Sequence, residues 1–149
     1  MSIFISIASY QDPLLASTIK SACMKASAEQ DLVFGVCDQS SSPIDASSLS
    51  KKAKIHYEHI DPILSKGPCW ARNRLQSFYQ GEDYFLQIDS HTQFDKDWDV
   101  VLMGQLRSLQ ELSSEPYFSK PIITAYPRSF EVISIKDCLL YTSPSPRDN

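Results

Sequence analysis

The chain has 149 residues, of which 42% are hydrophobic and 21% charged, and its formal net charge is −4. This is the size and composition of one globular domain or a part of one. The only basic cluster is formed by Lys51, Lys52 and Lys54. The sequence therefore argues against binding to nucleic acid or to an anionic membrane, because either would need a positively charged face.

The cellular location is predicted from targeting features that the sequence does not show. No segment reaches the roughly 18–20 apolar residues that span a bilayer, and the first residues lack the basic region of a signal peptide. The four cysteines are widely spaced and form no C-x-x-C pair, so we expect reduced thiols. These features predict a cytoplasmic location with no membrane partner.

The first half of the chain predicts three strands and a helix. Residues 3–8 form a short apolar run typical of a buried strand. Asp12 followed by proline is a helix start signal, and apolar side chains then recur at helical spacing to about residue 28. Residues 32–37 predict a second buried strand. After a serine-rich loop at 40–50, alternation over residues 55–59 predicts a third, more exposed strand.

The second half continues the alternation. Gly67 and Pro68 open a second helix, with Gly81 expected as its C-terminal cap. Residues 84–88 are expected to be the central strand, and Asp97 is expected to cap a third helix. Two further strands are predicted at residues 121–126 and 132–135.

This order of elements predicts the fold class. Strands that alternate with helices indicate an α/β fold with a mostly parallel sheet flanked by helices on both faces. In such sheets ligands bind outside the carboxyl ends of the strands. Polar side chains follow three of the predicted strands at those ends: Ser9 and Tyr10, Asp38 and Gln39, and Asp89, Ser90 and His91. We therefore expect these side chains to converge on one site.

Asp89 and His91 are the candidate metal ligands. They lie two residues apart at the end of an apolar run, and on an extended backbone they would point to the same side. A carboxylate and an imidazole suit a divalent cation, with Mn²⁺ favoured over Mg²⁺. The alternative is a turn followed by a surface histidine.

The other strand-end residues are candidates for binding a nucleotide sugar. Tyr10, after Ser9, could stack on a base, and Asp12 could accept hydrogen bonds from base or ribose or could simply cap the helix. Arg72 could clamp a phosphate or could lie on the solvated face of its helix. The two remaining candidates are Gln39 and Ser90, the latter for a hydrogen bond to phosphate. The four glycines are isolated, so the sequence has no glycine-rich phosphate-binding loop of the P-loop or dinucleotide-binding type.

Ordered sequence blocks resemble a known family. They are residues 5–13 (ISIASYQDP), 34–37 (FGVC), 67–72 (GPCWAR), 81–94 (GEDYFLQIDSHTQF) and 120–127 (KPIITAYP). In this order they resemble the GlcNAc-transferase family, which includes a cytosolic enzyme that modifies a protein hydroxyproline. The Asp-Ser-His block is also similar to that of the polypeptide GalNAc-transferases.

The resemblance implies a GT-A fold and transfer from UDP-GlcNAc to a hydroxyl of a protein or glycan, with retention of anomeric configuration. It also implies that Asp89 and His91 bind the metal, and that the end of the first strand and residues 70–72 line the donor pocket. Gln11 departs from the family pattern, where arginine is expected.

Length is a second departure. Catalytic domains of the family are about twice as long, so residues 1–137 are expected to be the donor-binding part, with a third metal ligand and the acceptor site outside it. Residues 138–149 have no apolar periodicity and are expected to be a disordered or artefactual tail.

Two alternatives remain open from the sequence. One is a nucleotide-sugar-binding fragment without catalysis. The other is an α/β phosphate enzyme similar to the sugar nucleotidyltransferases, which would need a glycine-rich loop near the first strand, where this chain has Ser-Tyr-Gln-Asp.

Overall fold

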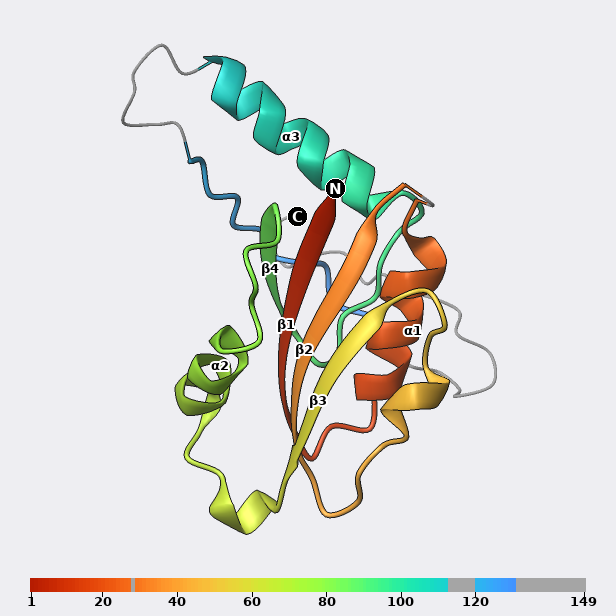
Figure 1. The fold of residues 1–149 in the computed structure, drawn as a ribbon, viewed down its shortest axis with the longest axis vertical. Coiled ribbons are helices and arrows are strands. Elements are labelled where there is room, and N and C mark those ends of the chain that lie inside the picture. The colour runs from red at the N-terminus through yellow and green to blue at the C-terminus, as the bar shows by residue number, and fades with distance from the viewer. Residues whose placement is uncertain (28, 113–119, 131–149) are drawn as a thin grey trace, which may run out of the picture. The chain divides into compact units, whose positions relative to one another are not determined.

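The computed structural model describes residues 1–27, 29–112 and 120–130. The chain divides into two compact units, Met1–Gln105 and Leu106–Asn149. The first unit holds β1 (Ser2–Tyr10), α1 (Leu15–Lys25), β2 (Asp31–Gln39), β3 (Lys54–Ile60), α2 (Pro68–Gln76) and β4 (Tyr84–Asp89), and α3 (Trp98–Leu112) runs across the boundary (Figure 1). Two short 3₁₀ turns lie at Ala46–Ser48 and Pro62–Leu64.

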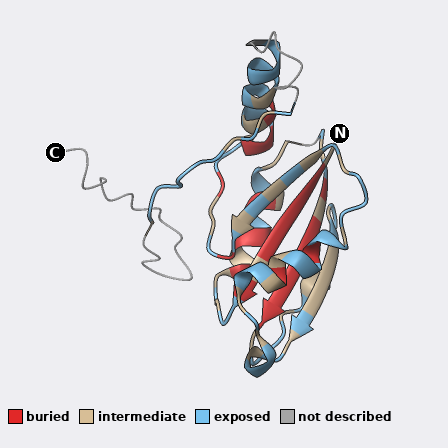
Figure 2. Cartoon of the chain, turned by 90° about the vertical axis from the view of Figure 1, so that its left-hand side faces the viewer, coloured by how far each residue is buried: buried red, intermediate tan, exposed pale blue. Residues whose placement is uncertain are grey.

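A parallel sheet forms the centre of the first unit. Its strand order is β3-β2-β1-β4, and each neighbouring pair is parallel. The buried residues run along β1 and β2, the two inner strands (Figure 2). The predicted α/β fold with a mostly parallel sheet flanked by helices is confirmed.

The two faces of the sheet are covered by different helices. Odd-numbered side chains of β1 such as Ile5 pack with Phe34 of β2 and with Leu15 and Ile19 of α1. Successive side chains of a strand point to opposite faces, so Cys37 lies on the other face, where it packs with Ala71 and Leu75 of α2. α1 therefore covers one face of the sheet, and α2 covers the other.

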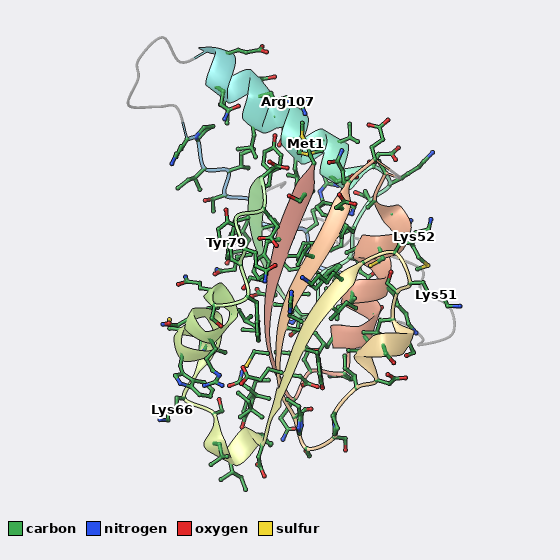
Figure 3. The ribbon with its side chains drawn as sticks, viewed as in Figure 1. Met1, Lys51, Lys52, Lys66, Tyr79 and Arg107 are labelled. Atoms are coloured by element: carbon green, nitrogen blue, oxygen red, sulfur yellow. The ribbon has the colours of Figure 1, made fainter. Side chains whose placement is uncertain are left out.

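The second face also holds a cluster of aromatic rings. Phe4 is fully buried, and its ring lies 5.7 Å from that of Tyr79 and 5.3 Å from that of Phe85. Gly35, on the neighbouring strand, leaves the space that the tip of the Phe4 ring fills. Lys51 and Lys52 are exposed in the loop before β3 (Figure 3).

Four details differ from the sequence predictions. Among the described residues β4 is an edge strand, not the central one, and its side chains alternate in burial because only β1 pairs with it. Residues 121–126 form no strand. The first helix ends at Lys25, because Ala26 is extended. The second ends at Gln76, so Gly81, with φ of 93°, lies in the following loop and does not cap it.

Some sequence predictions fall on other parts of the chain. The predicted strand at 132–135 and the tail at 138–149 lie outside the described residues. Among the described helices, none has the length and apolar character needed to cross a membrane. The cytoplasmic location stays a prediction.

Gly35→Ala tests the close approach of Phe4. An added Cβ would lie 2.6 Å from Phe4 Cζ, so we expect a loss of about 1–3 kcal/mol in the free energy of unfolding from overpacking. The matched control is Gly104→Ala in α3, where the added Cβ meets nothing within 4 Å and helix propensity should add about 0.5–1 kcal/mol. Urea titrations would measure both; equal effects would contradict the packing argument.

Candidate functional site at the carboxyl ends of the strands

The strand ends converge as the sequence predicts. In the sheet register Ala8 of β1 pairs with Asp89 of β4, and on the other side Ser9 and Tyr10 pair with Asp38 and Gln39 of β2. The polar residues at the ends of three strands thus share one edge of the sheet.

A cavity of about 380 Å³ opens at this edge. Its lining residues come from the ends of β1 and β2 and from the segment before α2: Ala8, Ser9, Tyr10, Gln39, Ser65, Gly67 and Pro68. Ser9, Tyr10 and Gln39 were predicted donor-binding residues. The wall formed by residues 65–68 is a lining segment that was not predicted from the sequence. Gly67, with φ of 88°, marks a turn there that few other residues would adopt.

Gln39 holds this wall in place. It is buried, its Nε2 donates to the Ser9 carbonyl at 2.9 Å, and its Oε1 accepts from Ser65 Oγ at 2.6 Å. Both ends of the amide are therefore engaged within the chain. Tyr10 is different, because 59% of its surface is exposed beside the cavity.

Asp38, next to Gln39, serves the loop that follows β2. Its Oδ2 accepts from the Tyr57 hydroxyl at 2.6 Å, and the Tyr57 oxygen accepts from Ile44 N–H at 3.1 Å. Burial, followed by the hydrogen bond to Asp38, raises the pKa of Tyr57 above its ordinary value. The phenol is therefore a stable donor.

The Asp-Ser-His segment forms a turn that is held by α1. β4 ends at Asp89, and residues 90 and 91 turn away from the strand direction. Thr18 Oγ1 donates to the Ser90 carbonyl at 2.6 Å and accepts from Thr92 N–H at 3.0 Å. One threonine thus satisfies two backbone groups of the turn.

Asp12 is the side chain on which the turn converges. Its Oδ2 accepts from Ser90 Oγ at 2.6 Å and contacts His91 Nδ1 at 2.8 Å, while its Oδ1 accepts from Leu14 N–H at 2.9 Å. Burial by itself would raise the pKa of Asp12, but the hydrogen bonds from Ser90, Leu14 and His91 outweigh it and lower that pKa. The predicted role of Asp12 as the helix cap is wrong, because α1 begins at Leu15 and Leu14 occupies the cap position, two residues later than the Pro13 signal suggests.

Arg72 and Asp89 meet on the opposite side of the strand end. Arg72 Nη2 lies 3.3 Å from Asp89 Oδ1, and 64% of the Asp89 side chain is exposed. Arg72 Nε is buried and, among the described residues, has no hydrogen-bond partner. The Asp89 carboxylate is therefore mostly open to solvent, and the Arg72 guanidinium keeps one N–H group without an acceptor among the described residues.

The neighbouring Arg74 has a structural role. Its Nε donates to Glu58 Oε2 at 2.9 Å and its Nη2 contacts Glu58 Oε1, which ties α2 to β3. The guanidinium also lies 5.1 Å from the centre of the Trp70 ring. These contacts fix the helix that carries Arg72.

A divalent metal fits the donor set in part. The exposed carboxylate of Asp89 and the ring of His91, 60% exposed, are ligands of the kind expected for Mn²⁺. Because the strand ends at Asp89, however, the two-residue alternation does not extend to His91, and the two side chains contact different partners. Within the described ranges no group of three histidine, cysteine or acidic side chains is placed to hold a metal. Asp89 and His91 as a metal pair remain a prediction.

A family sequence profile matches most of the chain. The profile described as Glycosyltransferase (GlcNAc) matches residues 2–54 and 44–143. The chain belongs to this glycosyltransferase family. The matched range includes the cavity, Asp12, Arg72 and the turn at residues 89–91.

A solved structure shares the fold of this family member. The crystal structure of S. aureus TarS residues 1–349 matches with a TM-score of 0.54 and 18% identity, over 74% of this chain and 33% of that chain. The chain thus spans about a third of the TarS chain. No curated protein sequence matches it.

Thr18→Val tests how the turn is held. Valine keeps the shape of the side chain but leaves the Ser90 carbonyl and the Thr92 N–H without their partner, which should lower the free energy of unfolding by about 1–3 kcal/mol. Thermal and urea denaturation would measure it, with Thr124→Val at an exposed position as control. Equal stabilities of the two variants would refute a structural role for the Thr18 hydroxyl.

Glu58→Gln tests the ion pair that fixes α2. The hydrogen bonds from Arg74 lower the pKa of Glu58. A lowered folded-state pKa means that the stabilisation is complete above the ordinary value of about 4.3 and is lost as the pH falls through the folded-state value. The stability advantage of the wild type should therefore be constant near neutral pH and shrink below about pH 4.3. Denaturation across pH 2–7, with exposed Glu29→Gln as control, would check it; an advantage that grows in acid would contradict it.

Proposed function

We propose that the chain is the donor-binding part of a metal-dependent glycosyltransferase that moves N-acetylglucosamine from UDP-GlcNAc to a hydroxyl acceptor. The observation that carries this proposal is the meeting of a cavity, an unsatisfied arginine and an exposed Asp-x-His turn at one sheet edge, in a chain of the GlcNAc glycosyltransferase family.

The cavity suits the uridine. Its volume of about 380 Å³ is in the range of small-molecule sites, about 300–1,000 Å³. Tyr10, which lines the cavity, has an exposed ring on which a base can stack. The amide of Gln39 holds the cavity wall in place. Ser9 is fully buried, so we expect it to contribute backbone atoms more than its hydroxyl.

Arg72 suits the diphosphate. Among the described residues its buried Nε has no hydrogen-bond partner and its Nη2 lies 3.3 Å from Asp89, so a phosphate oxygen can offer the guanidinium a further charged acceptor. Asp89 and His91 would hold a divalent ion, with Mn²⁺ favoured. When bound, such an ion neutralises the charge that develops on the diphosphate as the bond to the sugar breaks.

The acceptor and the stereochemistry are parts of the same proposal. We infer a hydroxyl of a protein, such as hydroxyproline, or of a glycan, and retention of the anomeric configuration. These inferences rest on the sequence blocks that resemble the family.

Calorimetric titration of UDP, with and without Mn²⁺, tests the proposal. We expect Mn²⁺ to strengthen UDP binding. Asp89→Ala and His91→Ala should each weaken the Mn²⁺-dependent binding by at least about 10- to 100-fold, the loss that removal of even an outer partner of a metal ligand causes. Arg72→Ala should weaken binding both with and without Mn²⁺, because it removes a direct phosphate contact.

Matched controls are Asp31→Ala, at the opposite end of the sheet, and His59→Ala, on the far edge strand. Binding that does not depend on Mn²⁺, or that survives both substitutions at 89 and 91, would remove the metal site. UDP binding without release of GlcNAc from UDP-GlcNAc would favour the alternative of a binding fragment without catalysis.

A further inference from the structure

Among the described residues, His91 meets a carboxylate through one of its two ring nitrogens. Nδ1 lies 2.8 Å from Asp12 Oδ2, and the His91 side chain is 60% exposed whereas that of Asp12 is 15% exposed. A carboxylate can only accept a hydrogen bond, so the proton of a neutral ring sits on Nδ1. Nε2 then carries the lone pair that a metal ion requires.

The carboxylate is itself held on both oxygens. Oδ1 accepts from Leu14 N–H at the start of α1, and Oδ2 accepts from Ser90 Oγ as well as from the histidine. Ser90 is fixed in turn by Thr18, which donates to its carbonyl. Asp12 therefore cannot rotate without breaking bonds to both the helix and the turn.

We propose that Asp12 is a positioning residue for His91, fixing the ring as its Nδ1–H tautomer so that Nε2 is left to bind the metal. The proposal rests on the proposed function, in which His91 is a metal ligand. It assigns Asp12 a role different from the base or ribose contact predicted from the sequence. Metal-binding histidines are commonly oriented by an outer carboxylate in this way.

Asp12→Asn is a selective test because it changes one atom. Leu14 N–H requires an acceptor, so the amide oxygen should stay with the backbone, and the NH₂ group should face Ser90 and His91. A donor at that place requires Nδ1 to accept, which moves the proton of His91 to Nε2. Asparagine keeps the size of aspartate and an oxygen that can accept from Leu14 N–H, so the variant should fold.

Nitrogen NMR of the full chain labelled with ¹⁵N-histidine, without metal and at about pH 8, reads the position of the ring proton directly. We expect Nδ1–H in the wild type and Nε2–H in Asp12→Asn. Calorimetry with MnCl₂ alone should then show a loss of about 10- to 100-fold in affinity. Asp45→Asn, which changes a capping aspartate next to Ser47, is the matched control and should change neither.

The outcomes separate the two proposals. Wild-type His91 in the Nε2–H form, or an unchanged tautomer in Asp12→Asn, overturns the positioning role even if Mn²⁺ binds through Asp89 and His91. If Mn²⁺ does not bind, the proposed function fails, and positioning for a metal fails with it whatever the tautomer. A tautomer switch together with the loss of Mn²⁺ affinity, in Asp12→Asn but not in Asp45→Asn, supports both.

Discussion

Parallel pairing of β1 with β2 on one side and with β4 on the other is the constraint on which the site depends. Parallel strands end at the same edge, so each strand delivers its terminal polar residues to one place. The register aligns Ala8 with Asp89 and Tyr10 with Gln39, which sets the cavity beside the Asp-x-His turn. A slip of one residue would turn these side chains to the opposite face.

The helices fix the positions of the side chains at that shared edge. α1 begins beside the end of β1, and its residue Thr18, together with Asp12 before it, binds the turn after β4. α2 covers the other face and is anchored to β3 through Arg74 and Glu58, which places Arg72 opposite Asp89. The two faces therefore contribute different chemistry: a buried hydrogen-bond network on the side of α1, and a loosely paired arginine on the side of α2.

This division explains why neighbouring polar residues have different roles. Asp38 and Gln39 are the last two residues of β2. Both are buried, and their side chains form hydrogen bonds within the protein, to Tyr57 and Ser65 respectively. Asp89 and His91, in contrast, keep most of their side-chain surface exposed. A charged or dipolar group left exposed beside a cavity is available to a ligand, whereas a buried one with all its partners satisfied is a structural element.

The four strands of the sheet, its parallel α/β arrangement and the edge where polar residues gather could all be predicted from the sequence, because apolar runs, helical spacing and turn residues are local signals. Its indication of Asp12 as the helix cap was wrong, because α1 begins at Leu15 and the cap position is Leu14. Tertiary structure alone decided which residues meet. Arg72 and Asp89 are 17 positions apart and Asp12 and His91 are 79 apart, and no local pattern encodes such pairs. The strand of residues 84–89 looked central from its composition, but its position at the edge depends on which strands pair with it, a property of the assembled sheet.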